Sequence, residues 1–278
     1  MIRSASSVGG SRWGRILVAL ILAGISLVSY FGLRSYNSVT GETQHVSITV
    51  DQEIALGLQA APEMAAEYGG LSSDAQAQAL VSRVGQTIIS GSATKDTPYQ
   101  FEFHLLADDE TINAFALPGG QLFITTGLLN QMETEGQLAA VLAHEVTHVV
   151  ARHSAEQIAK AQLTESLTGA AVMATYDPND AQTQGTAQVA MIVGQLVNLK
   201  FGRNDELEAD QLGVRFLSEA GYDPRAMLRV MEILEASSQG QQPPEFFSTH
   251  PNPENRITQI QAAIDAEFPN GVPEGLKQ

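Results

Sequence analysis

Cysteine is absent from this 278-residue chain, and basic residues are scarce. Without cysteine the protein can form neither a disulfide nor a thiolate metal site, so any metal must be held by histidine and carboxylate side chains. Only 15 Lys and Arg residues stand against 31 Asp and Glu residues, which gives a formal net charge of -16. Because nucleic acids and anionic lipid surfaces are themselves negative, we expect neither as the main partner. A solubilising surface is the simpler explanation of the acidity.

Charge is also missing from residues 16–33, ILVALILAGISLVSYFGL. As a helix this run would be roughly 27 Å long at about 1.5 Å per residue, close to the thickness of a hydrocarbon core. Arg3, Arg12 and Arg15 precede it, so the positive-inside bias places the N-terminus in the cytoplasm and the bulk of the chain outside. We interpret the run as an uncleaved transmembrane signal-anchor. A cleaved signal peptide is the alternative, although the run is long and no Ala-x-Ala pattern follows it.

Periodicities in the rest of the chain predict mostly helices and one small sheet. Helical patterns are expected from Asp51 with breaks at Pro62 and Gly69-Gly70, and then at 73–89, 134–160, 163–174, 187–199, 205–220, 224–238 and after Pro253. Alternating apolar residues predict strands at 101–105, 112–117 and 121–125, the last two joined by a turn at 118–120. The expected fold class is mainly α with a small antiparallel β-sheet, that is, α+β.

Five segments follow from these patterns. They are a cytoplasmic N-terminal tail (1–15), the signal-anchor (16–33), a polar tether (34–50), a folded domain (51–270) and a C-terminal tail (271–278). No internal repeat or heptad run is visible, and the length suits one large domain or two small ones.

The sequence His144-Glu145-Val146-Thr147-His148 lies inside one predicted helix. Residues four apart on a helix are about 40° apart, so His144 and His148 project from one face and can hold one metal ion. Glu145 lies roughly 100° from His144, where its carboxylate can take a proton from a water bound to the metal. The pattern arises by chance in roughly one such chain in a hundred, so hydrogen-bonded core histidines are the alternative.

A catalytic zinc site needs a third protein ligand and an open fourth position. His153 would lie about 140° round a continuous helix from His148, so we expect hydrogen bonding or packing for it. A better source is a later helix in which Glu206 and Asp210 share one face. One of them can ligate the metal while the other holds the free ring N–H of a ligand histidine. Glu208 faces elsewhere and is interpreted as a solvent-exposed charge.

Four motifs then follow one another along the chain: Asn113-Ala114-Phe115-Ala116-Leu117-Pro118-Gly119-Gly120, His144-Glu145-Val146-Thr147-His148, Glu206-Leu207-Glu208-Ala209-Asp210 and Ser248-Thr249-His250-Pro251. This series resembles the gluzincin metallopeptidases related to the CAAX prenyl endopeptidases, and within them the small bacterial cell-envelope quality-control members. The likeness covers roughly residues 51–268. It implies a zincin-like peptidase domain, one Zn²⁺ per chain and hydrolysis of peptide bonds. The integral-membrane relatives carry several spans, so substrates within the bilayer are not expected here.

The resemblance also implies roles for single residues. Zinc ligands are expected at His144, His148 and Glu206. Glu145 is expected to be the general base, and Asp210 to hold a ligand histidine. His250 is expected to reach the active site, where it stabilises the oxyanion or occupies the open zinc position in a latent form. A loop histidine held by turn contacts is the alternative for this residue.

The first hypothesis is a single-pass protein of the cell inner membrane with its peptidase domain on the periplasmic side, which hydrolyses misfolded or damaged cell-envelope proteins. An unfolded substrate would pair with a strand edge at Asn113, Ala114, Phe115 and Ala116, because main-chain pairing accepts many sequences. The second hypothesis is a latent protease that acts mainly as a client-binding chaperone or assembly factor, with the loop at 177–185 as part of a plug. The third is a zinc-stabilised scaffold. Glu145 favours the first, since metal binding does not need it. No particular envelope partner follows from the sequence.

Overall fold

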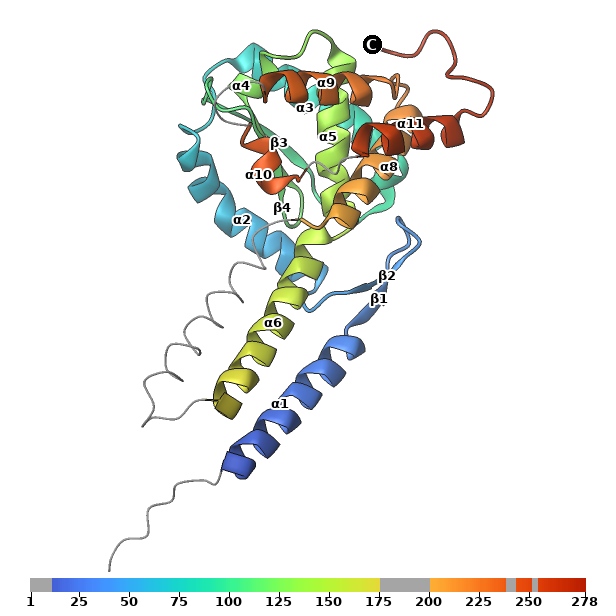
Figure 1. The fold of residues 1–278 in the computed structure, drawn as a ribbon. Helices are drawn as coiled ribbons and strands as arrows, with labels where there is room; N and C mark the ends of the chain where they lie inside the picture. Colours follow the sequence, from blue (N-terminus) through green and yellow to red (C-terminus); the bar gives the residue numbers. More distant parts are fainter. Residues whose placement is uncertain (1–11, 176–200, 239–243, 252–254) are drawn as a thin grey trace, which may run out of the picture. The chain divides into compact units, whose positions relative to one another are not determined.

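A computed structural model describes residues 12–175, 201–238, 244–251 and 255–278 (Figure 1). The predicted helix at 187–199, the loop at 177–185 and Pro253 lie outside the described residues. The chain forms two compact units. The first comprises the described residues within 1–35, 44–47 and 156–199, and the second those within 36–43, 48–155 and 200–278.

The first unit contains the apolar helix α1 (Arg12–Gly32) and most of α6 (His153–Thr175). Within the described residues, α1 is the one helix long and apolar enough to cross a membrane, although a signal sequence passes the same test. Its large apolar side chains are exposed, as Leu20 and Val28 illustrate at 66% and 75%. Such a surface suits a lipid environment. The predicted tether contains two short strands, β1 (Arg34–Tyr36) and β2 (Thr43–His45), which pair with each other.

A three-stranded sheet in the second unit has the order β3-β5-β4. Its strands are β3 (Glu102–Leu106), β4 (Ala114–Leu117) and β5 (Gln121–Thr125). β4 and β5 pair antiparallel, as the predicted turn requires, whereas β3 pairs parallel with β5. The mainly helical fold with one small sheet is confirmed. The antiparallel expectation holds for the hairpin alone, because β3 joins the sheet across a long connection that can return in either direction.

Both faces of the sheet are covered by helices. Leu122 and Ile124 of β5 belong to the main core, together with side chains of α3 (Ala75–Gly91) and α5 (Glu135–Val150). Phe123, whose side chain points to the opposite face, stacks on Phe115 and forms a smaller core with α2 (Val50–Glu67). This alternation follows from the period of two in a strand. It explains why β5 is buried throughout.

Helix α3 begins after a capping residue, because the carboxylate of Asp74 accepts hydrogen bonds from the backbone N–H groups of Gln76 and Ala77. The expected break at Pro62 is wrong, since Pro62 lies inside α2. Packing overrides the local preference here, because α2 lies so close to the sheet that a Cβ on Gly57 would be 1.9 Å from the carbonyl oxygen of Pro118.

Helix α5 is the centre of the second unit, and α3, α8 (Arg203–Glu219) and α9 (Ala226–Ser237) pack against it (Figure 1). The remaining helices of the described residues are η1 (Ala93–Asp96), α4 (Thr126–Leu129), α10 (Phe246–Thr249) and α11 (Arg256–Glu267). The single helix expected at 134–160 is wrong: α5 ends at Val150, and α6 starts at His153 after Arg152 adopts a φ of 58°.

Candidate metal centre

Helix α5 carries the first three site residues into the core. Thr134 caps the helix, with Gln137 completing the capping box, so α5 starts at a fixed residue. His144, Glu145 and His148 follow within a wholly buried stretch and are at most 3% exposed. The Nε2 atoms of the two histidines are 3.1 Å apart. The helical spacing therefore brings both rings to one point, as predicted.

Glu206 reaches the same point from α8. Its Oε1 atom lies 3.5 Å from His148 Nε2, and its Oε2 atom lies 3.5 Å from His144 Nε2. The glutamate is fully buried and bridges the two rings. Of the two carboxylates expected to serve this site from α8, Glu206 is therefore the one that faces the metal position.

His250 completes the group from the residue that follows α10. Its Nδ1 atom is 3.1 Å from Glu206 Oε1, and its Nε2 atom is 3.5 Å from Glu145 Oε1. The ring is fully buried and stacks on Phe246 at a centroid distance of 4.4 Å. His250 is thus brought into the cluster, and the interpretation as a loop histidine held by turn contacts does not describe its position.

The four side chains can hold a metal ion. One ligand atom from each of His144, His148, Glu206 and His250 lies within 4.8 Å of all the others. Several polar atoms here are buried without a hydrogen-bond partner among the described residues, namely Glu145 Oε1 and Oε2, Glu206 Oε2 and His250 Nε2. Since buried polar atoms are normally satisfied, their convergence points to a cation. Imidazole nitrogens with a carboxylate are a donor set suited to zinc.

Asp210, one turn beyond Glu206 on α8, supports the first histidine. Its Oδ1 atom lies 3.0 Å from His144 Nδ1, so the ring N–H can donate to the carboxylate and Nε2 can face the cluster. Arg256 at the start of α11 donates to both oxygens of Asp210, at 2.6 and 2.9 Å, and approaches Glu206 Oε2 at 3.3 Å. Arg256 is 3% exposed. Reasoning from the sequence missed it, because a single basic residue at a helix start carries no local signal.

Burial and neighbouring charges shift the pKa values of the two buried glutamates in opposite directions. Burial raises the pKa of Glu145, whose nearest cationic partners only partly oppose it. Burial would also raise the pKa of Glu206, but the surrounding histidines outweigh it and hold the pKa well below its usual range. Burial lowers the pKa of His144, yet the hydrogen bonds to Asp210 and Glu206 win and raise it to about 9. Glu206 is therefore the ionised carboxylate of the two, and Glu145 is the more basic one.

Hydrogen bonding by His153 is confirmed, but its expected direction is wrong. His153 does not point away from the site: its Nδ1 atom lies 2.8 Å from His148 Nδ1. Glu208 is not a free surface charge, because its Oε2 atom lies 3.2 Å from His153 Nε2. Both errors come from the helix break at Arg152, which turns the chain back toward α8.

The predicted substrate strand lies beside the cluster. Residues 114–117 form β4, an edge strand of the sheet, and β4 packs against α5. Asn113 precedes it and donates from Nδ2 to the hydroxyl of Tyr68. The end of this edge is covered by α10, since the backbone N–H of Phe246 donates to the carbonyl oxygen of Ile112.

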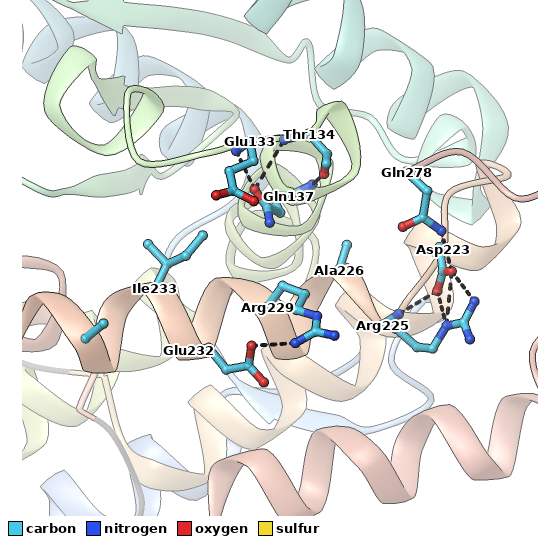
Figure 2. A pocket seen from close by; sticks show the side chains of 11 residues that line it. Glu133, Thr134, Gln137, Asp223, Arg225, Ala226, Arg229, Glu232, Ile233 and Gln278 are labelled. Atoms are coloured by element: carbon cyan, nitrogen blue, oxygen red, sulfur yellow. Dashed lines mark hydrogen bonds and ion pairs between the residues drawn. The ribbon is translucent and has the colours of Figure 1, made fainter.

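A cavity of about 620 Å³ lies away from this chemistry, between the start of α5 and helix α9 (Figure 2). Its walls contain no histidine, and four of its charged side chains are paired with each other, Arg225 with Asp223 and Arg229 with Glu232. The buried cluster, and not this open hollow, is the candidate site.

Sequence comparison agrees with that geometry. The model of Peptidase family M48 matches residues 74–264, which include every member of the cluster. The chain belongs to peptidase family M48. It is a zinc metalloendopeptidase, and the resemblance seen in its four motifs is confirmed.

Relatives of this M48 peptidase differ in length. Mitochondrial metalloendopeptidase OMA1 of Schizosaccharomyces pombe is 35% identical over 254 residues, which is 90% of this chain and 72% of the relative. Beta-barrel assembly-enhancing protease of Yersinia pestis is 31% identical over 224 residues, or 78% of this chain. Its Escherichia coli counterpart is 34% identical over 183 residues, or 64% of this chain. The chain spans only 45% and 37% of these two bacterial proteins.

Proposed function

We propose specific roles for the residues of the centre: zinc ligation by His144, His148 and Glu206, general base catalysis by Glu145, and orientation of His144 by Asp210. The observation that carries the proposal is the carboxylate of Glu145. Both of its oxygens are buried beside the ligands without a hydrogen-bond partner among the described residues. A structural site would have no use for such a group, whereas hydrolysis requires one.

These residues divide the work of hydrolysis. Zinc, when bound, supplies a Lewis acid that acidifies water and polarises the scissile carbonyl. Glu145 accepts the proton of the attacking water and later delivers it to the leaving amine. Burial raises the pKa of Glu145, which strengthens it as a base. Glu206 stays ionised because the histidines hold its pKa low. No side chain attacks the carbonyl, so the reaction has no covalent intermediate.

The proposed substrates are misfolded or damaged cell-envelope proteins. Among the strands of the described residues, β4 pairs with β5 alone, and the side chains of Ala114 and Phe115 are buried. An extended polypeptide could therefore pair with Asn113, Ala114, Phe115 and Ala116 through the main chain, with little dependence on its sequence. Such pairing needs an unfolded segment. Two bacterial relatives are named for beta-barrel assembly, which supports an envelope setting for the substrates.

The proposed location is the cell inner membrane, crossed once by residues 16–33, with the peptidase domain (51–270) on the periplasmic side. Supporting this, α1 is apolar and exposed, and Arg3, Arg12 and Arg15 before the apolar run favour a cytoplasmic N-terminus. Residues 1–15 are then a cytoplasmic tail, 34–50 a tether and 271–278 a tail at the other end.

Unfolded chains should be cleaved and folded ones should not. We expect the purified full chain with zinc to digest casein, and to cleave a disulfide-bonded globular protein at least about 100-fold more slowly, because cleavage then depends on the rare unfolded population. Reducing that protein should restore its digestion, as followed by gel electrophoresis. Equal rates on the folded and reduced forms would contradict the proposed substrate class.

A latent protease that serves mainly as a client-binding chaperone or assembly factor is the second candidate. One segment favours it, because His250 lies inside the metal cluster while the backbone N–H of Phe246 donates to Ile112, two residues before the edge strand β4. The same segment is held from outside, where Tyr68 donates from its hydroxyl to Glu245 at 2.7 Å. In this arrangement α10 covers both the fourth ligand position and the substrate edge.

If the protease is latent, His250→Ala should raise its rate of casein cleavage. If an open form is roughly 1–10% populated, the variant should cleave casein about 10- to 100-fold faster, because the competent fraction no longer limits the rate. Zinc content should be measured alongside, with His104→Ala on β3 as the control outside the cluster. An unchanged rate would count against latency. A fall in rate with zinc retained would instead identify His250 as the group that stabilises the oxyanion.

A further inference from the structure

Three side chains form a continuous hydrogen-bonded line that ends at the metal position. His148 faces the cluster with Nε2 and meets His153 with its other ring nitrogen, the two Nδ1 atoms being 2.8 Å apart. The far nitrogen of His153, Nε2, lies 3.2 Å from Glu208 Oε2. His153 is fully buried, and the side chain of Glu208 is 23% exposed. The line therefore runs from the cluster to the edge of solvent.

A backbone conformation that costs free energy creates this line. A continuous helix would place His153 about 140° from His148, facing away. Instead α5 ends, and Arg152 adopts a φ of 58°, a left-handed conformation that is unfavourable for a side chain of this size. Arg152 is held there by donating to Glu53 Oε2 at 3.1 Å and to the carbonyl oxygen of Ile48 at 2.8 Å. The fold thus stabilises a strained residue whose effect is to return His153 to His148.

The position of the proton on each of the two imidazole rings follows from the contacts that its nitrogens make. A neutral imidazole has one donor and one acceptor nitrogen. To ligate a metal, His148 Nε2 must carry its lone pair, so its proton is on Nδ1 and donates to His153 Nδ1. His153 then carries its own proton on Nε2, which donates to Glu208. This assignment satisfies both contacts at once and leaves Nε2 of His148 free for the metal.

We propose that His153 and Glu208 are positioning residues that fix the tautomer and the ring orientation of His148. This rests on the proposed ligation of zinc by His148. His144 has its carboxylate, Asp210, directly on Nδ1 at 3.0 Å, whereas His148 reaches its carboxylate through a second imidazole. Both carboxylates come from α8, which also carries Glu206. One helix therefore supplies a ligand and orients both histidines.

Neighbouring contacts hold the line in place. Phe201 stacks on the ring of His148 at a centroid distance of 4.2 Å and an interplanar angle of 28°. The stack holds the plane of the ring, and a 180° flip within that plane would break the bond from Nδ1 to His153. A ring restrained on two sides loses little entropy when it binds a metal.

Zinc affinity of the purified full chain tests the proposal by competition with a chromophoric chelator at fixed pH. Loss of an outer partner of a metal ligand weakens affinity by roughly 10- to 100-fold, and we expect that range for His153→Leu. His153→Gln offers an oxygen acceptor to His148 Nδ1 and should recover part of the loss. Glu208→Gln should weaken binding less. Matched controls outside the line, His104→Gln and Glu232→Gln, should bind zinc as the wild type does.

The double variant His153→Leu with Glu208→Gln tests whether the two residues act as a relay, in which Glu208 affects His148 only through its hydrogen bond to His153, or whether each acts separately by packing. Because Glu208 acts only through His153, we expect Glu208→Gln to cause no further loss in the His153→Leu background. Additive losses, or wild-type affinity in folded His153→Leu, would overturn the relay. If His153→Leu does not fold, the same cycle is run with His153→Gln, in which Glu208→Gln should have a smaller effect than in the wild type. Absence of zinc binding by the wild type would overturn the relay together with the proposed ligands, whereas tight binding by both the wild type and the variants overturns the relay alone.

Discussion

Glu145→Gln is expected to stop casein cleavage while zinc stays bound. Glutamine has the same shape but cannot accept a proton, and a general base contributes typically about 10²- to 10⁴-fold to the rate. Zinc should remain because the group that could hold the metal, His144, His148, Glu206 and His250, does not include Glu145. The rate would be followed with fluorescently labelled casein, and the zinc content by metal analysis of the same sample.

Glu102→Gln is a matched control for this variant, because it makes the same change on the exposed side of β3. It should leave the rate unchanged. Casein cleavage by Glu145→Gln at the wild-type rate would remove Glu145 from the mechanism. Full biological activity of the same variant would favour a zinc-stabilised scaffold over a protease.

Glu206→Gln is expected to lose both zinc and activity. The carboxylate of Glu206 lies 3.5 Å from the Nε2 atoms of His144 and His148, and its low pKa keeps it anionic at the metal position. An amide carries no charge and is a poor zinc ligand. The loss of zinc affinity should exceed the roughly 100-fold that removal of an outer partner costs. Chelator competition measures the affinity.

Glu232→Gln on the exposed surface of α9 is the control for this second change, since its partner Arg229 is also exposed. It should keep zinc and activity. Wild-type zinc affinity in Glu206→Gln would show that a different side chain provides the third ligand.

The core of the site could be predicted because it depends on helical geometry, which is local. A separation of four residues fixes a shared face, so the pairing of His144 with His148 and of Glu206 with Asp210 follows from the sequence. The need of a catalytic zinc for a third protein ligand suggests that the two pairs meet. His250 was indicated by the resemblance and not by any property of its own segment.

The outer part of the site could not be predicted because a distant contact decides it. His153 and Glu208 were misplaced since the sequence around Arg152 reads as a continuous helix. The left-handed conformation of Arg152 depends on Glu53, which belongs to another helix. No local sequence pattern predicts the hydrogen bond between Arg152 and Glu53.

Two further features depend on the whole fold in the same way. The role of Arg256 depends on α11, which places its guanidinium beside the carboxylate of Asp210. The parallel pairing of β3 with β5 depends on how a long connection returns to the sheet, whereas the antiparallel hairpin of β4 and β5 follows from its turn. Local chemistry predicts the hairpin, and nonlocal packing decides the rest.

Zinc content and casein cleavage, measured together on the wild type, Glu145→Gln and Glu206→Gln, decide whether this chain is a zinc peptidase with Glu145 as its base. The wild type should hold one zinc ion per chain and cleave casein in a chelator-sensitive reaction. Glu145→Gln should hold one zinc ion without cleavage, and Glu206→Gln should hold neither zinc nor activity. Chelator-resistant cleavage by the wild type, or cleavage by Glu206→Gln without zinc, would contradict this mechanism.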